Sequence, residues 1–304
     1  MSDYVRKFML RGIFIFFAGW CCCFHCDGQL KKFYSIKNEA AFDTVRFSLK
    51  ATSGTCYVKS SFHADPVTIY GNPDFSDVNP TFHSDIKNNT NHVRLNLEDY
   101  KKSGLSHTIA YNMFGSDDED MNYWKVYLNE HKIYNLNLNY GVGNAIVNLS
   151  SIPVSNVKIE TGSADVNVEY DFLKPNNCLM DTFLVKVDLG SITTQNVNLS
   201  NARYVIAEVG FGNAVLDFNK GPKRKCNVNA SVGAGNLTVI MPNHNTPAII
   251  YFKKSPLCNI SIKGGFEEVE KDVYVNPEYE ANAENLLTFT LDVALGNITF
   301  EYTD

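Results

Sequence analysis

The residue types in this chain that most often carry out chemistry are its cysteines, histidines, serines and acidic residues. Beyond the N-terminal segment the cysteines stand singly, at Cys56, Cys178, Cys226 and Cys258, and none forms a CxxC pair. No histidine falls in an HxH or HExxH pattern, so the ligand spacing of a zinc site is missing. No serine lies in the GxSxG context of a hydrolase nucleophile. We therefore expect no catalytic residues, no metal site and no cofactor.

One acidic run and three glycine pairs could be functional, but each has a structural interpretation. Asp117–Asp120 could hold calcium through oxygen ligands, but calcium loops space their ligands and place a glycine at the bend. We favour a solvated loop over residues 115–122. Gly141-Val-Gly143, Gly210-Phe-Gly212 and Gly233-Ala-Gly235 could suggest phosphate loops. A dinucleotide loop needs GxGxxG at the start of a helix, whereas each copy here continues as a strand, so we interpret these glycines as strand bends.

The composition indicates a folded protein and argues against nucleic acid as a partner. The chain has 304 residues, of which 44% are hydrophobic and 20% charged, with a net charge of −6. That hydrophobic share is enough to bury a core. Phosphate binding needs concentrated Lys and Arg, and the tight basic run Lys223–Lys225 follows Gly221-Pro222 and is typical of a solvated turn.

Residues 1–28 are predicted to be a signal peptide outside the fold. Basic residues come first, at Arg6, Lys7 and Arg11. The apolar run Gly12–Phe24 is too short to span a bilayer by itself, and we expect cleavage before Gln29 and export. The Gly28-Gln29 junction resembles those of exported Bacteroidetes proteins. An uncleaved anchor and a lipid anchor remain alternatives, although Trp20 stands where a lipobox needs a small residue.

A repeated sequence motif fills most of the remaining chain and predicts its strands. The motif is a run of alternating apolar residues, then a glycine, then a small or polar residue, and then a second run of alternating apolar residues. Copies occur at Leu136–Leu149, Val157–Tyr170, Val185–Thr194, Val205–Phe218, Val228–Met241 and Phe289–Tyr302, with a weaker one at Phe42–Val58. We expect the chain to bend at Gly141, Gly162, Gly190, Gly210, Gly233 and Gly296. Asn-Φ-Ser/Thr triplets recur in the copies, and the alternation predicts Asn and Ser/Thr outward with the apolar residue inward.

These copies predict an all-β fold, a right-handed β-helix-like solenoid of stacked strand–turn units. A strand of period two has one apolar face, and glycine permits positive φ at a bend. One unit cannot bury its apolar face alone, so neighbours must stack at about 4.8 Å. We expect an N-terminal β region over 29–130 with early irregular units, and regular units over 131–304. Between the last two copies there is room for three more units, and residues 71–92 are expected to be a loop.

Cys226 and Cys258 are candidates for a disulfide. Each lies seven residues before a glycine, Gly233 and Gly265 respectively. If those units are neighbours in the stack, the two sulfurs lie at equivalent depth, and a bridge is permitted in an exported chain. Two buried thiols are the alternative, and the remaining Cys56 and Cys178 have no assigned partner.

From Leu136 onward the pattern resembles the toast-rack domain of LiaF-type cell-envelope stress proteins and their adhesin-like relatives. The matching stretches are LNLNYGVGNAIVNLSSIPVSNVKIETGSADVNV, EVGFGNAVLDF and SVGAGNLTVIMP, within residues 131–300. The resemblance implies a solenoid-like rack of strand–glycine–strand units and supplies no catalytic residues. No block of transmembrane helices like that of some members is visible, so membrane-embedded signalling is not implied.

The function expected from these observations is a non-catalytic exported protein of the periplasm or cell surface. It would be adhesin-like or LiaF-like and act by contact with an envelope protein or glycan, with a homodimer through one end of the solenoid as an option. The alternative is a carbohydrate-binding or carbohydrate-active β-helix, for which exposed aromatic residues and paired carboxyl groups would argue. Tyr123 and Trp124 are the local hint, but we favour packing in the core or at a cap for them. A purely structural module is the third hypothesis.

Overall fold

The computed structural model describes residues 32–72, 80–97, 123–171, 173–242, 246–253 and 255–302. The expected signal peptide over 1–28 and the acidic run over 115–122 lie outside these residues. Within the described ranges, no helix has the length and apolar character needed to cross a membrane.

The fold is all-β, as the alternating pattern predicts. The elements are β1 (Lys32–Ile36), β2 (Thr44–Ser61), β3 (Val67–Asn72), β4 (Thr81–Lys87), β5 (Thr90–Leu97), β6 (Tyr123–Asn129), β7 (Ile133–Asn148), β8 (Val154–Glu169), β9 (Met180–Gln195), the 3₁₀ turn η1 (Val197–Ser200), β10 (Ala202–Asp217), β11 (Cys226–Met241), β12 (Ala248–Lys253), β13 (Cys258–Ile262), β14 (Glu267–Glu270), β15 (Val273–Val275) and β16 (Leu287–Tyr302). Strands β7 to β11 and β16 have 16 residues each.

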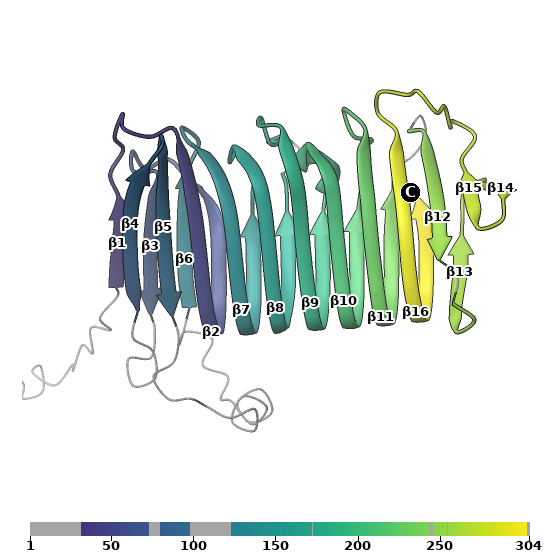
Figure 1. Ribbon diagram of the computed structural model, residues 1–304, viewed down its shortest axis with the longest axis horizontal. Coiled ribbons are helices and arrows are strands. Elements are labelled where there is room, and N and C mark those ends of the chain that lie inside the picture. Colours follow the sequence, from purple (N-terminus) through teal and green to yellow (C-terminus); the bar gives the residue numbers. More distant parts are fainter. Residues whose placement is uncertain are drawn as a thin grey trace, which may run out of the picture. The chain divides into compact units, whose positions relative to one another are not determined.

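Each long strand bends in its middle, so that it has a first arm before the bend and a second arm after it (Figure 1). Neighbouring long strands pair in parallel along both arms and form one 16-stranded sheet. Because every long strand bends, this sheet has two facing layers. We call each bent strand a rung of the stack. In Figure 1 the chain descends through the nearer arms and returns through the farther ones while it advances from left to right, which is the right-handed sense. The solenoid-like architecture is therefore confirmed.

The bends form a column of glycines in register across the rungs. The column holds Gly54, Gly143, Ala164, Gly190, Gly212, Gly235 and Gly296. Its glycines all have positive φ, for example 141° at Gly212. Of the predicted bend glycines, Gly190 and Gly296 belong to this column. Gly141, Gly162, Gly210 and Gly233 lie two residues earlier, so that part of the prediction is corrected.

The order of rungs departs from the order of the chain at both ends. From β7 to β11 the rungs follow the sequence, but β16 then pairs directly with β11, with Gly235 opposite Gly296. The expectation of three units between these two copies is therefore wrong. The intervening residues form β12 and β13 on the far side of β16, where β12 pairs with its first arm and β13 with its second arm.

The N-terminal end has the same split design. Strands β5 and β6 pair with the first and second arms of β2, respectively. Antiparallel strands then extend the edge of each layer. Strand β4 pairs with β5 in the first layer, and in the second layer β3 pairs with β6 and β1 pairs with β3. At the opposite end β15 and β14 close the first layer. Strand β14 carries Glu267, Glu268 and Glu270, all exposed, and charged edge strands disfavour pairing between copies.

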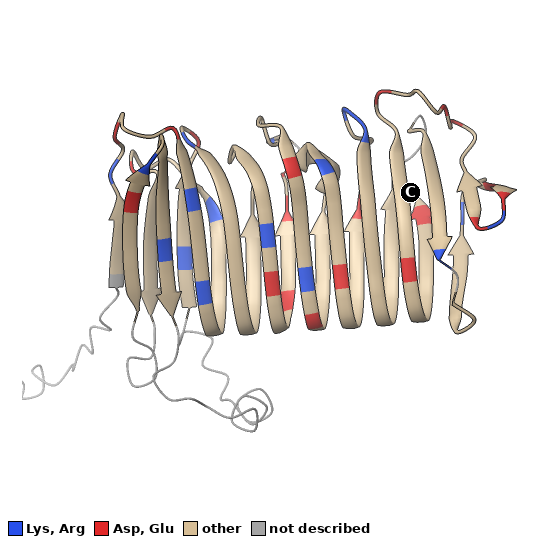
Figure 2. Cartoon of the chain, in the orientation of Figure 1, with Lys and Arg blue, Asp and Glu red and all other residues tan. Residues whose placement is uncertain are grey.

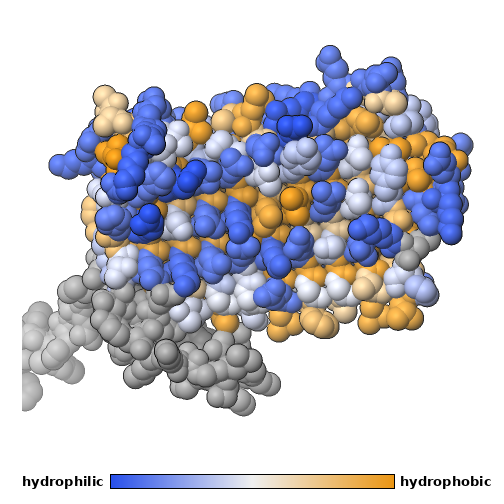
Figure 3. All heavy atoms as spheres, in the orientation of Figure 1, coloured by the Kyte–Doolittle hydropathy of each residue, from blue (hydrophilic) through white to orange (hydrophobic). Residues whose placement is uncertain are grey.

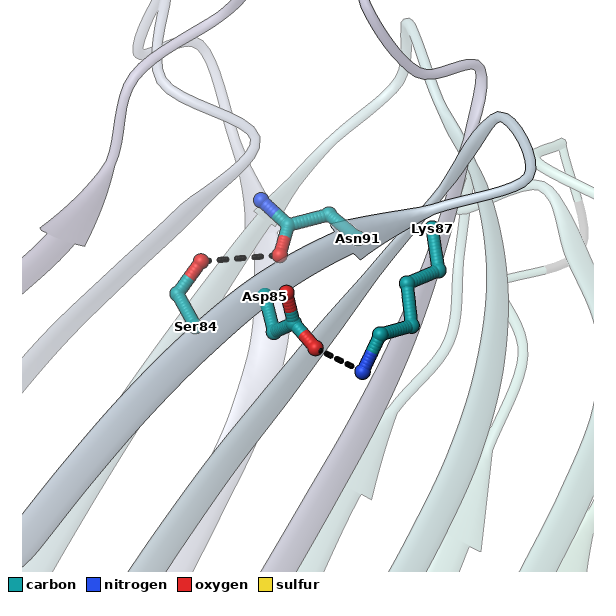
Figure 4. A network of polar contacts seen from close by, with 4 residues as sticks. All are labelled: Ser84, Asp85, Lys87 and Asn91. Atoms are coloured by element: carbon teal, nitrogen blue, oxygen red, sulfur yellow. Dashed lines mark hydrogen bonds and ion pairs between the residues drawn. The ribbon is translucent and has the colours of Figure 1, made fainter.

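Residues 81–97 form a β-hairpin, which corrects the expected loop over 71–92. Its turn is Asn88-Asn89, and both residues have positive φ, which asparagine tolerates. Figure 4 shows two polar contacts in this hairpin: the Ser84 hydroxyl donates to Asn91 Oδ1 at 2.8 Å, and Lys87 lies 2.5 Å from Asp85. The hydrogen bond from Lys87 holds the pKa of Asp85 below its ordinary value. The pair is exposed and contributes little to stability.

The core lies between the two layers and runs through the whole stack. Phe289 from the first arm of β16 meets Phe300 from its second arm, with ring centroids 5.4 Å apart. Phe218 of the β10 rung packs on Phe289 at 5.6 Å, and Phe252 of β12 lies 6.3 Å from Phe300. Inward side chains from both arms thus join into one hydrophobic cluster. The thin shared interior that the repeats predict is present.

Candidate functional site

The two outer faces of the folded sheet differ in their chemistry. The face of the first arms carries a column of mixed charges, in which Lys186 and Glu208 lie 3.5 Å apart and Lys253 and Asp292 lie 4.0 Å apart. Blue and red residues therefore alternate on the nearer arms in Figure 2, and this face is largely hydrophilic in Figure 3. Exposed pairs of this kind keep a surface soluble and add little else.

The face of the second arms carries aromatic side chains at its N-terminal end. We define the tyrosine cluster as the outward side chains of Phe33, Tyr57, Lys59, Tyr70, Tyr123, Lys125 and Tyr127. They come from β1, β2, β3 and β6, which lie side by side in the order β1-β3-β6-β2. The register places Phe33 opposite Tyr70, Tyr70 opposite Lys125, and Lys125 opposite Tyr57. Four separate strands, of which β6 is far from the others in sequence, thus meet on one surface.

The cluster alternates rings and ammonium groups at contact distance. The ring centroids of Tyr70 and Tyr127 lie 5.7 Å apart, and those of Phe33 and Tyr70 lie 5.2 Å apart. Lys125 Nζ lies 4.6 Å from the centroid of Tyr123 and 5.8 Å from that of Tyr57. Lys59 Nζ lies 5.1 Å from the centroid of Tyr127. Each lysine is thus held over a ring by cation–π attraction, which orders both partners.

Buried residues beneath the cluster hold its strands in place. Trp124 points inward and is 2% exposed, and its indole lies so close to Gly71 that a Cβ there would come within 2.5 Å of the ring. Because Trp124 faces the core, period two turns Tyr123 and Lys125 outward. The Tyr134 hydroxyl donates to Pro66 O at 2.7 Å and fixes the loop before β3. Of the two residues singled out in the sequence, Tyr123 lies in the cluster and Trp124 lies in the core.

Further along the same face, asparagine side chains form a ladder across four rungs. Asn236 Nδ2 donates to Asn213 Oδ1 at 2.8 Å, and Asn297 Nδ2 donates to Asn236 Oδ1 at 2.7 Å. Asn259 continues the series toward Asn297 at 3.4 Å. These amides are exposed, and the apolar residue after each is turned inward, as the Asn-Φ-Ser/Thr triplets predict for Asn236, Asn259 and Asn297.

Two shallow hollows follow this ladder. One, of about 510 Å³, is lined by Asn213, Asn236, Thr238, Asn259 and Thr299 among others. The second, of about 500 Å³, lies along the bends and includes Leu189, Phe211 and Asn213. Leu189, Phe211, Leu257 and Leu295 are each more than half exposed and form an apolar ridge beside the bends. The residues that the structure describes include no group of three His, Cys, Asp or Glu placed to hold a metal ion.

The candidate disulfide is not formed, because its two cysteines lie on rungs that are not neighbours. Cys226 begins the first arm of β11, opposite Leu287, whereas Cys258 begins β13, opposite Gly296. Strand β16 lies between them, and both thiols are free, as are Cys56 and Cys178. The inference from equal spacing failed because β13 pairs with a second arm while Cys226 lies on a first arm.

The four thiols are expected to differ sharply in reactivity. Burial raises the pKa of Cys56 and of Cys226 to about 12, whereas Cys178 and Cys258 are only partly buried. Because the thiolate is the nucleophile, alkylation of the native protein should label Cys178 and Cys258 first. Peptide mapping after brief iodoacetamide treatment should find at least about 100-fold slower labelling of Cys56 and Cys226, for which unfolding supplies the control. A Cys226–Cys258 linked peptide would contradict the structure.

Comparison with known proteins places this architecture in a family. A likeness to solved structures extends over most of the chain. It includes a protein named for cell adhesion from Clostridium sporogenes (12% identity, 90% of this chain and 99% of that chain, TM-score 0.43). Others are a protein named as an adhesin from Bacteroides fragilis (14%, 89% and 96%, 0.32) and one named as lipid-binding from Parabacteroides distasonis (10%, 90% and 96%, 0.31). At these scores the likeness carries no argument about function, and no curated protein matches the sequence.

The family model that matches is the N-terminal domain of toast_rack, DUF2154, over residues 27–177. This match begins well before Leu136, so it includes the early rungs that the motif comparison left out. It ends after β8, and the structure continues the same glycine-bent rungs through β9, β10, β11 and β16. With the bend column, the parallel register and this match together, the chain is a member of the toast-rack family.

Proposed function

We propose that this toast-rack protein is a non-catalytic, adhesin-like protein of the cell envelope that attaches to surface carbohydrate through the tyrosine cluster. The observation that supports it is the cluster itself: rings and lysines from four strands on the outer face of a sheet. Aromatic rings offer an apolar surface for the C–H faces of a sugar and hydroxyls for its polar groups. The cation–π contacts order the lysines before a ligand arrives, which lowers the entropic cost of binding.

The scaffold supports an attachment role because it is rigid and repetitive. Every long strand pairs with a neighbour on each side along both arms. A rigid sheet holds side chains at fixed spacing, so several weak contacts can act together. Export is part of the proposal and rests on the basic and apolar pattern of residues 1–28.

The test is retention of the protein on isolated envelope polysaccharide, with matched tyrosine variants. Tyr127→Ala should weaken retention about tenfold or more, because this ring contacts Tyr70 and Lys59 at the centre of the cluster. Tyr251→Ala is the control, since Tyr251 is 41% exposed but lies on the first-arm strand β12. Equal retention of both variants and the unchanged protein would refute the proposed site.

Contact with an envelope protein is the second candidate, and the apolar ridge of Leu189, Phe211, Leu257 and Leu295 favours it. Exposed apolar side chains in a row are typical of protein-binding surfaces. Retention of the protein on whole envelope, with and without protease treatment, separates the two. Protease treatment of the envelope should leave retention unchanged if carbohydrate is the ligand, and should abolish it if a protein is the partner.

A further inference from the structure

Five of the seven residues of the tyrosine cluster, all but Lys59 and Tyr127, lie on two columns of outward residues, and the asparagine ladder lies on one of these columns. One column runs Tyr123, Thr55, Asn144, Asp165, Ser191, Asn213, Asn236, Asn297 and Asn259. The other runs Phe33, Tyr70, Lys125, Tyr57, Ile146, Asn167, Thr193, Val215, Thr238, Thr299 and Ser261. The aromatic end therefore continues mostly into amides and hydroxyls, with Ile146, Asp165 and Val215 as the exceptions.

The two hollows lie on this continuation and adjoin at Asn213, which lines both, and we refer to them together as the groove. Its floor offers amide and hydroxyl groups, and Leu189 and Phe211 of the apolar ridge border one part of it. Asp165 is the one charged residue in the two linings. The groove suits a ligand that is uncharged, rich in hydroxyls and apolar on the faces of its rings.

The spacing of the groove indicates a polymer with a short repeat. The second arms of β8, β9, β10, β11 and β16, and β13 beyond them, each present an Asn, Asp or Ser beside a Thr, Ser, Asn or Val. Successive rungs lie about 4.8 Å apart. That interval is close to the length of one sugar ring in an extended chain. From Tyr123 on β6 to Asn259 on β13 there are eight steps between neighbouring strands, or roughly 38 Å.

Other extended polymers fit this face less well. A peptide strand binds by pairing with an unpaired sheet edge, whereas the strands along this groove are paired on both sides, except for β13, which pairs with β16 alone. A nucleic acid needs a row of cations, and the lining from Gly143 to Asn259 contains none.

We propose that an uncharged linear polysaccharide lies along the second-arm face, parallel to the stack, from the tyrosine cluster to the asparagine ladder. The proposal rests on the carbohydrate-binding function and adds the class of glycan, its direction and a second contact region. A chain long enough to reach both regions gains from their effective concentration, so affinity should rise with chain length beyond what the tyrosine cluster alone can contact.

The experiment titrates the full chain with size-sorted neutral fragments of the envelope polysaccharide. Affinity should rise at least tenfold from short to long fragments. Asn236→Ala/Asn297→Ala should remove most of this rise and leave short fragments almost unaffected, whereas Asn229→Ala, exposed on the first arm of β11, should change neither. Urea denaturation midpoints check that each variant is folded. Thr238→Lys, which fills the groove without altering the ladder, is the second variant.

The outcomes separate the two proposals. If Tyr127→Ala weakens retention but affinity does not depend on fragment length or on the ladder variants, the extended site is wrong and the carbohydrate function stands. If anionic fragments bind more tightly than neutral ones of equal length, the uncharged class is wrong. If no polysaccharide fragment binds, both proposals fail.

Discussion

Replacing Gly212 with alanine is expected to destabilise the protein by about 3 kcal/mol or more. Gly212 has φ of 141°, a conformation that a side chain makes costly. A Cβ at this position would also lie 1.7 Å from the carbonyl oxygen of Gly190 on the adjacent rung. That oxygen belongs to a backbone paired on both sides, so it cannot move without disturbing the ladder. Urea denaturation followed by tryptophan fluorescence and far-UV circular dichroism measures the loss.

The control is Ala164→Gly, which makes the reverse change in the same column of the stack. Ala164 lies in register with Gly143 and Gly190, and it does not have positive φ. Its replacement should therefore cost about 0.5–1 kcal/mol, the ordinary entropic penalty of glycine in a strand. If Gly212→Ala proved as mild as Ala164→Gly, the close approach of neighbouring bends would not be what requires glycine.

The bends show which features of the fold the sequence predicts and which it does not. Alternating apolar residues around a glycine correctly predict a bent strand and, by repetition, a stack with a shared core. In Gly210-Phe-Gly212, however, both glycines suit a bend. Both also face a carbonyl oxygen of the neighbouring rung: an added Cβ would lie 2.5 Å from that of Asp188 at Gly210 and 1.7 Å from that of Gly190 at Gly212. Only Gly212 has positive φ. The local pattern does not distinguish the two glycines, so four of the six predicted bend residues are two positions early.

The ends of the stack show a second limit. The copy at Phe289–Tyr302 has the same sequence motif as the copy at Val228–Met241, so β16 can pair with β11 in full register. The residues between them have no complete copy, so they form half-length strands outside β16 instead of rungs inside it. Spacing along the chain suggested the opposite, and the predicted Cys226–Cys258 bridge depended on it.

The candidate site could be predicted only in part from the sequence, for the same reason. Period two is consistent with Tyr57, Tyr123 and Tyr127 pointing away from the core, but the expectation from sequence for Tyr123 is packing in the core or at a cap. Their meeting depends on β6 lying beside β2, with β3 and β1 outside β6. Long-range pairing of this kind is not encoded in a strand's own pattern. By contrast, the contact between Asn213 and Asn236 follows from the repeats, because equal positions in consecutive rungs are neighbours. The contacts of Asn297 depend on the place of β16, which the repeats do not predict.

Asn176→Ala is the second substitution with a large expected effect, and it concerns a residue whose role only the structure reveals. Asn176 follows Pro175 and is typical of a solvated loop, yet it is 3% exposed. Its Nδ2 donates to Val154 O at 2.7 Å and to Ser200 O at 2.8 Å. Its Oδ1 accepts from the backbone N–H of Val154 at 3.1 Å and of Cys178 at 3.0 Å. One amide therefore joins the loops of three successive rungs.

Alanine at this position would leave several buried backbone groups without partners, each at a cost of about 1–3 kcal/mol. We expect a total loss of about 3 kcal/mol, measured as a lower urea midpoint at unchanged slope. Asn213→Ala is the matched control, since that exposed amide bonds a side chain and its loss should cost less than about 1 kcal/mol. Equal effects would mean that water replaces the Asn176 amide and that the loops need no clamp. The difference between them would show that the stack is stabilised at its loops by buried amides as well as along its bends by glycine.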